Sequence, residues 1–103
     1  RVDLRDCADK AELLQRLAGA LKFPAHFGHN FDALADALGD LRQPKLPGLV
    51  LLLENTERLR RHALADFKTT MEVLQAASRE WAAWHQPFWA FVALDDAEFN
   101  TLG

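Results

Sequence analysis

Two uninterrupted apolar runs, residues 49–53 and 88–94, constrain the fold of this chain more than any other feature. Neither run shows the polar alternation of a strand that has one face in water. Continuously apolar runs of this length are typical of strands covered on both faces, as in parallel sheets. The stretch between them, like the stretch before the first, is long enough for helical crossovers, so we expect parallel strands joined by right-handed connections.

Helix signals fill the stretches between these strands. Asp9, with Glu12 three residues later, forms the capping pattern of a helix N-terminus. Asn30 is a good N-cap for a second helix, and Asn55 with Thr56 offers another cap after the central strand. The sequence thus predicts a short strand over 1–5, helices over 10–22 and 31–41, a strand over 49–54, helices over 57–62 and 64–84, and a strand over 88–94.

This order of elements predicts an α/β fold, a three-stranded parallel sheet with helices packed on it, in a single domain spanning residues 1–103. Half of the 103 residues are apolar and 26% are charged, which is the composition of a compact domain rather than a disordered chain. We expect Trp81, Trp84 and Trp89 to fill the core between the last helix and the sheet, with Trp84 up to half exposed. The acidic tail 95–103 is expected to be peripheral.

Charge, cysteine content and hydropathy disfavour several classes of protein. The chain has 12 Lys and Arg against 15 Asp and Glu, a net charge of −3, so direct binding to nucleic acid is not expected. No apolar run approaches the ~20 residues of a membrane helix, so no membrane association is expected. Cys7 is the single cysteine, which favours a reducing compartment, the cytoplasm. The absence of a Gly-rich phosphate loop and of a catalytic triad pattern predicts no cofactor and no enzymatic activity.

The feature with most bearing on function is a row of carboxylates on the predicted second helix. Asp32, Asp36 and Asp40 lie within about 80° of one another around the helix axis, opposite the apolar residues of that helix. No Lys or Arg occurs between Lys22 and Arg42, so the row has no counterion at helical spacing. Such a row is either a solvated polar face or a surface for a cationic partner.

The surroundings of the row favour the second interpretation. Alanines at alternate positions from 33 to 37 keep the helix surface flat, so that a partner backbone can approach closely. The preceding connection places His26, Phe27 and His29 beside the helix N-terminus, and rings next to carboxylates are common interface anchors. Gly28 can take a positive φ there. Phe27 is equally consistent with a core position.

One segment of the chain reads Phe23-Pro-Ala-His-Phe-Gly-His-Asn-Phe-Asp-Ala-Leu-Ala-Asp-Ala-Leu38. It closely resembles the signature of the barstar family, the cytoplasmic inhibitors of secreted barnase-type ribonucleases. The specific part is aromatic-Gly-x-Asn-x-Asp-Ala-Leu-x-Asp-x-Leu, which residues 27–38 match at every fixed position. Outside the signature, a weaker resemblance extends over nearly the whole chain. It implies a barstar-like three-stranded parallel sheet with packed helices, in agreement with the fold expected from the residues alone.

The resemblance also implies roles for individual residues. Asp36 matches the carboxylate that enters the phosphate-binding site of the nuclease in place of a substrate phosphate. Asp32 matches a second carboxylate, which pairs with basic residues of the nuclease. His26 stands where the family has a ring that packs on the active-site histidine of the nuclease, and Gly28 and Asn30 stand at the backbone approach before the helix.

Several positions depart from the family pattern and bear on the identity of the target. His26 replaces a tyrosine, His29 replaces an acidic residue, and Ala35 replaces an interfacial tryptophan. A further family carboxylate, on the last helix, corresponds to Glu80 if one residue is inserted and to Arg79 without a gap.

Together these features predict an immunity protein, a monomer on its own, that neutralises a nuclease toxin or another extracellular-type ribonuclease by blocking its basic cleft. Two alternatives stay open. One is a regulatory module that binds some other basic protein through the same scaffold. The other is a small metal-dependent enzyme using His26 and His29. The predicted partner-binding residues are His26, Phe27, Gly28, His29, Asn30, Asp32, Ala35, Asp36, Asp40 and Glu80.

Overall fold

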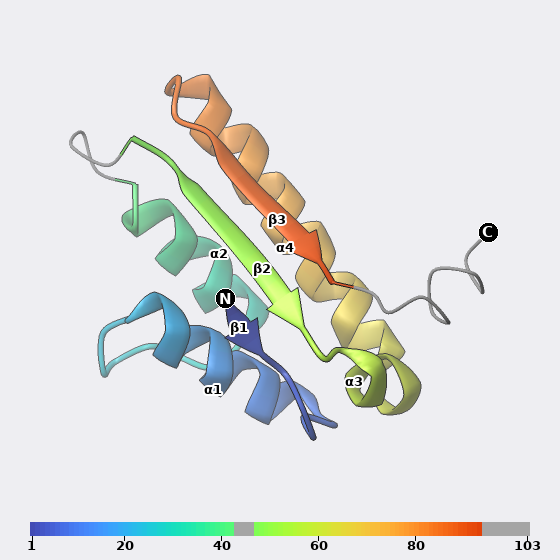
Figure 1. Cartoon of the computed structure of the whole chain (residues 1–103). Helices are drawn as coiled ribbons and strands as arrows, with labels where there is room; N and C mark the ends of the chain where they lie inside the picture. Colours follow the sequence, from blue (N-terminus) through green and yellow to red (C-terminus); the bar gives the residue numbers. More distant parts are fainter. Residues whose placement is uncertain (43–46, 94–103) are drawn as a thin grey trace.

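A computed structural model of the chain describes residues 1–42 and 47–93. The three strands form one parallel sheet in the order β1, β2, β3 (Figure 1). The predicted α/β fold is therefore confirmed, with a first strand shorter than expected. The elements are β1 (Val2–Asp3), α1 (Lys10–Leu21), α2 (Phe31–Asp40), β2 (Leu49–Glu54), α3 (Glu57–His62), α4 (Leu64–Ala83) and β3 (Phe88–Val92).

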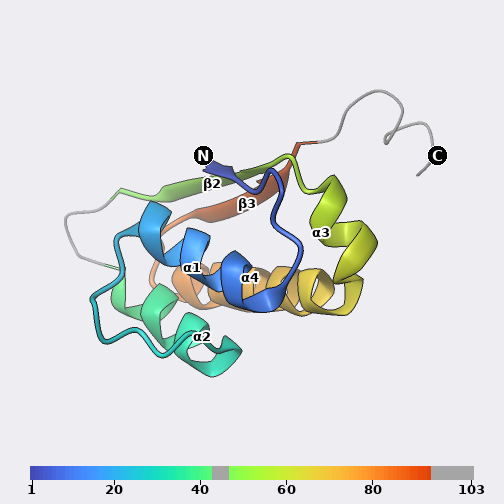
Figure 2. The same cartoon turned by 90° about the horizontal axis from the view of Figure 1, so that it is seen from below.

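The helices cover one face of the sheet. Helices α1, α2 and α4 lie on the same side of the strands, and α3 lies at the end of β2 (Figure 2). On the covered face Leu51 and Phe88 are buried, whereas Val50, Trp89 and Phe91 on the other face are more than half exposed. For the described residues, the predictions that both strand faces are covered and that Trp89 lies in the core are wrong. An apolar run indicates a strand, but the number of covered faces depends on how many helices pack on each side.

Helix α4 joins the sheet to α2. Trp81 is fully buried and packs edge-on against Phe88 of β3, with ring centroids 5.2 Å apart. Its indole Nε1 donates a hydrogen bond to the main-chain carbonyl of Leu38 in α2, at 3.1 Å. Trp84, just past the end of α4, is 60% exposed, and the guanidinium of Arg42 lies 4.0 Å from its ring centroid. Trp81 thus occupies the predicted core position, whereas Trp84 lies at the surface.

The predicted caps of α1 and α2 are confirmed. The side chains of Asp9 and Asn30 each accept a hydrogen bond from the backbone N–H three residues later, at 2.8 and 2.7 Å. The predicted cap of α3 is wrong, because Thr56 makes no capping bond and its hydroxyl oxygen accepts from Nε of Arg60 at 2.9 Å. Asn55 adopts a left-handed conformation, with φ 58°. The Asn55-Thr56 pair therefore shapes the turn after β2 without capping the helix.

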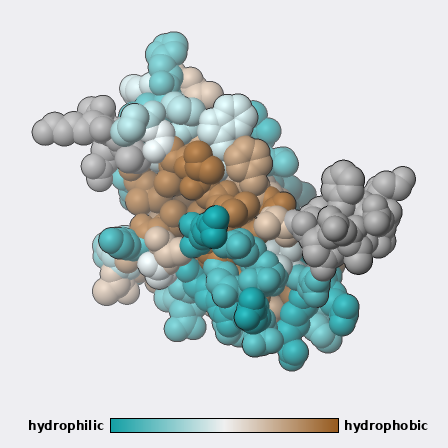
Figure 3. Space-filling model, viewed as in Figure 1, coloured by the Kyte–Doolittle hydropathy of each residue, from teal (hydrophilic) through white to brown (hydrophobic). Residues whose placement is uncertain are grey.

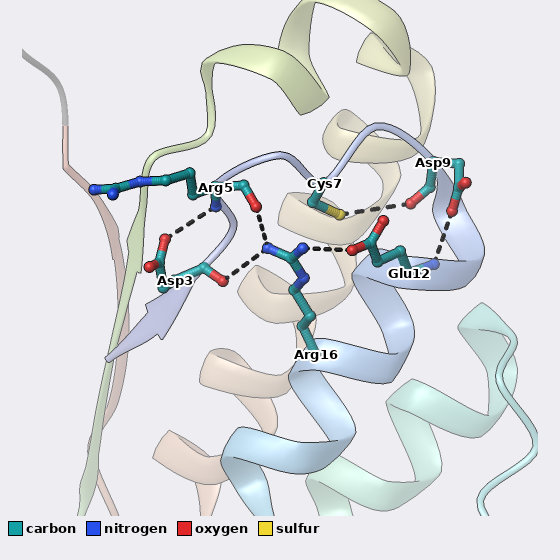
Figure 4. Close-up of polar contacts among 6 residues, drawn as sticks. All are labelled: Asp3, Arg5, Cys7, Asp9, Glu12 and Arg16. Atoms are coloured by element: carbon teal, nitrogen blue, oxygen red, sulfur yellow. Dashed lines mark hydrogen bonds and ion pairs between the residues drawn. The ribbon is translucent and has the colours of Figure 1, made fainter.

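Arg16 ties α1 to the segment that leaves β1. Its guanidinium donates to the main-chain carbonyls of Asp3, at 3.2 Å, and of Arg5, and it pairs with the carboxylate of Glu12 one turn earlier (Figure 4). Cys7, which lies within this segment, is fully buried, and burial raises the pKa of its thiol. The first strand is short, so these side-chain contacts fix its exit toward the helix.

The Asp3 carboxylate links the exits of β1 and β2. It accepts hydrogen bonds from the side-chain amide of Asn55, at 2.8 Å, and from the backbone N–H of Arg5, at 2.9 Å. The amide of Asn55, followed by the N–H of Arg5, holds the pKa of the Asp3 carboxyl below its ordinary value.

Two sequence expectations concern residues that the structure does not describe. The tail 95–103 and Leu94, the predicted end of the last strand, lie beyond the described part of the chain.

Of the helices within residues 1–42 and 47–93, none is long and apolar enough to cross a membrane.

Candidate protein-interaction face

Helix α2 is the outermost layer of the fold. It packs against α4, on the side of α1 and α4 that faces away from the strands (Figure 2). Leu34 and Leu38 are fully buried on its inner side. Asn30 fixes its start, because the side-chain oxygen caps the helix while the amide Nδ2 donates to the Gly28 carbonyl at 3.0 Å. The helix is therefore held by one apolar side and leaves the opposite side to solvent.

Three carboxylates occupy that opposite side. Asp32, Asp36 and Asp40 are exposed and lie one turn apart along α2. Across residues 1–42 and 47–93, no hydrogen bond or ion pair engages any of them. Arg42, the cation closest in sequence, places its guanidinium over Trp84 instead. The row of negative charge predicted from sequence is thus present and uncompensated within the described chain.

A hollow of about 360 Å³ lies between this row and the connection that precedes α2. Asp36 and Asp40 line it from the helix, and Lys22 and His26 line it from the connection. Apolar side chains, among them Phe27, form much of the remaining lining. A hollow with apolar walls and two carboxylates suits a group that is both apolar and cationic, such as a long basic side chain or an imidazolium ring.

Phe27 differs from the other predicted site residues because its ring is buried, at 8% exposure. It packs against the rings of Phe23 and His29, each with a centroid 5.0 Å away. The ring therefore anchors the connection and forms a wall of the hollow. The other predicted residues of the connection and helix, His26, Gly28, His29, Asn30 and Ala35, are exposed.

Gly28 does not adopt the positive φ that a glycine permits at this point of the connection. Among the described residues no glycine has a positive φ, and the left-handed conformation falls on His29, with φ 42°. A Cβ at Gly28 would lie 3.4 Å from the Ala33 Cβ and 3.4 Å from the side-chain nitrogen of Asn30. These are ordinary van der Waals distances, so neither the backbone angle nor the packing against the first turn of α2 requires a glycine here.

Glu80 extends the acidic surface from α2 onto α4. A Cβ at Gly39 would lie 3.9 Å from the Oε1 atom of Glu80, so this carboxylate sits against the end of α2. Arg79 is one residue away, about 100° around the helix, and points to a different side. The structure therefore brings Glu80, and not Arg79, next to the row.

Sequence reasoning missed two neighbours of this surface. Lys22, the C-cap of α1, adopts a left-handed conformation with φ 57° that turns the chain toward the hollow. Trp84 lies exposed beside Arg42, next to the end of α2. Pro24, soon after α1, indicates the turn, but no periodicity in the sequence reveals that α2 and α4 meet there.

The two histidines are not part of a cluster suited to a metal. Within the described ranges, no group of three or more His, Cys, Asp or Glu side chains is arranged to hold an ion. The alternative of a metal-dependent enzyme using His26 and His29 therefore finds no support in the side chains that the fold brings together.

The fold and this surface define a class of protein, a small α/β domain that carries an uncompensated acidic helix on the outside of its helical layer. Residues 1–93 match the model of the Barstar family, described as barstar (barnase inhibitor). The chain belongs to the Barstar family. No curated protein matches it at a significant level.

Proposed function

We propose that this protein inhibits a barnase-type ribonuclease by inserting the exposed side of α2 into the active-site cleft of the nuclease. The observation that carries the proposal is the row of Asp32, Asp36 and Asp40, exposed and without counterions in the described chain. Membership of a family of ribonuclease inhibitors supports it.

The physical basis is charge complementarity. A ribonuclease concentrates basic groups around the phosphate that it cleaves, so its cleft is positive. A helix with carboxylates at successive turns presents negative charge at fixed positions and competes with the phosphates of RNA. Opposite potentials also accelerate the encounter, and salt slows it by screening over a Debye length of ~8 Å at physiological ionic strength. No bond is made or broken, and the inhibition is competitive.

Within this surface we assign Asp36 the central role. Of the three carboxylates in the row it occupies the middle, and it also lines the hollow, where an apolar and cationic group of the nuclease can reach it. Asp32 and Asp40 extend the negative charge by one turn on each side, and Glu80 adds a carboxylate from α4. His26 borders the hollow from the connection and contacts the same inserted group.

The departures from the family pattern bear on which nuclease is bound. Ala35 leaves a flat area where the family has a tryptophan, and His26 offers a smaller, titratable ring where it has a tyrosine. We therefore expect a target whose cleft differs from that of barnase in shape while keeping its positive charge. A free, buried Cys7 is consistent with a cytoplasmic location, where an immunity protein meets a nuclease before export.

The test is inhibition of RNA cleavage by purified barnase-type ribonucleases, including one encoded beside this protein where the genome offers it. The wild type should inhibit at least one of them. Asp36→Asn, which removes the charge and keeps the shape, should weaken inhibition roughly 30-fold or more, since removing one partner of a desolvated charge pair costs about 2 kcal/mol.

The matched control is Asp6→Asn, because Asp6 is also exposed but lies in the turn after β1, away from α2. It should inhibit like the wild type, and both variants should melt at nearly the wild-type temperature. Equal inhibition by Asp36→Asn and wild type contradicts the assigned site. Failure to inhibit any of the ribonucleases, combined with capture of a different basic protein that Asp36→Asn no longer binds, favours the regulatory module instead.

A further inference from the structure

The face of the sheet that the helices leave open is apolar. Val50 and Leu52 of β2, with Trp89 and Phe91 of β3, point to this side because they alternate with the inward-facing residues of each strand. Val50 is 64% exposed, Trp89 57% and Phe91 51%. Figure 3, which looks onto this face, shows apolar residues gathered in one central area over the two strands. These four residues are called the sheet patch below.

The sheet patch is one contiguous apolar area and not a set of scattered side chains. The rings of Trp89 and Phe91 lie nearly parallel, with an interplanar angle of 2° and centroids 6.4 Å apart. At their exposed fractions these two side chains alone leave on the order of 200 Å² open, and the two aliphatic residues add to it. A contiguous apolar area of a few hundred Å² on a small protein is often a binding surface.

The charges around the sheet patch indicate the kind of partner. On the β1 side, Arg1 forms an ion pair with Glu54 at 3.9 Å, and Asp3 pairs in register with Glu54. Arg5 directs its side chain away from the helices (Figure 4). Two cations and two anions leave the rim neutral along this β1 side, so a two-fold axis can set cations of one copy opposite anions of another. The acidic side of α2 cannot meet its own copy in this way, because like charges would face each other.

We infer that two copies of this chain associate back to back through the sheet patch, with Trp89 and Phe91 at the centre of the interface. Stable interfaces bury about 800 Å² on each partner, and the sheet patch with its rim is smaller, so the association is weak and concentration-dependent. Because the helices lie behind the sheet, each copy keeps its α2 face exposed (Figure 2). The sequence predicts a monomer, and this inference departs from that expectation.

Sedimentation velocity of the full chain from about 10 μM to about 1 mM tests this association. The wild type should shift from a species of 11.6 kDa toward twice that mass as the concentration rises. Trp89→Thr, which keeps a residue suited to strands, should stay monomeric at concentrations where the wild type has shifted. Val50→Glu should do the same, because it places a carboxylate inside the apolar area.

Trp84→Thr is the matched control. Trp84 is as exposed as Trp89, at 60%, but lies at the end of α4 and not on the sheet, so its replacement should leave the association unchanged. Circular dichroism of each variant verifies that it is folded. Trp89→Thr and Val50→Glu change the sheet and not α2, so the inhibition assay with these two variants stays independent.

Three results overturn the inference. A wild type that remains monomeric at about 1 mM shows that the sheet patch does not bind a second copy, whatever else covers it. A dimer that persists in both folded patch variants places the interface elsewhere. A dimer that Trp84→Thr abolishes also places the interface away from the sheet patch.

Discussion

Replacing Trp81 with phenylalanine should weaken the contact between the two helices that form the acidic surface. The change removes the indole N–H that donates to the Leu38 carbonyl at 3.1 Å, in a fully buried site. A buried carbonyl left without its partner costs about 1–3 kcal/mol. The smaller ring also leaves empty volume beside Phe88, which adds about 1 kcal/mol. We expect a total loss of about 2–4 kcal/mol in the free energy of unfolding.

Urea denaturation followed by far-UV circular dichroism measures this loss, because the signal reports the helices rather than any one tryptophan. Trp84→Phe is the control: Trp84 is 60% exposed, and a phenylalanine can still lie under the Arg42 guanidinium. It should change the free energy of unfolding by no more than about 0.5 kcal/mol. If the two variants lose the same amount, the buried hydrogen bond does not hold α2 against α4 as described.

Two further substitutions test local contacts. Asn30→Ala removes the cap of α2 and should lower the free energy of unfolding, measured by urea denaturation, by about 1 kcal/mol. Asn30→Asp keeps a hydrogen-bond acceptor and should lower it less. Equal losses in the two variants would contradict the capping role. Asn55→Ala removes the donor that most lowers the pKa of Asp3. A carboxyl whose folded-state pKa is lowered stabilises the fold above its unfolded pKa, and that stability is lost as the pH falls through the folded value. The wild type should therefore lose more stability than Asn55→Ala between about pH 5 and pH 2 in parallel melting experiments. If the melting temperatures of both proteins fall equally with pH, the hydrogen bond from Asn55 does not lower the pKa of Asp3.

The elements of this fold could be predicted because their local signals are strong. Asp9 and Asn30 mark helix starts by side-chain chemistry that needs no tertiary partner, and both caps are present. The spacing of four residues between Asp32, Asp36 and Asp40 also fixes their common side once the segment is helical. Local geometry was sufficient for these features.

Features that depend on packing could not be predicted in this way. The chain around Phe27 is compatible with either a buried or an exposed ring, and only the contacts with Phe23 and His29 decide it. Trp89 reads as a core residue by composition, but no helix packs on its side of the sheet within the described residues. The proximity of Glu80 to Gly39 arises from the way α2 lies against α4, which no pattern within either helix specifies.

The position of α2 on the outside of the helical layer has a consequence for how the protein can evolve. Its inner leucines are buried, whereas the outward carboxylates of Asp32, Asp36 and Asp40 make no hydrogen bond or ion pair within the described residues. Substitutions at those outward positions can therefore alter which target is recognised while leaving folding stability nearly untouched. The same separation makes the helix a practical site for a randomised library, in which selection acts on recognition and the scaffold stays constant.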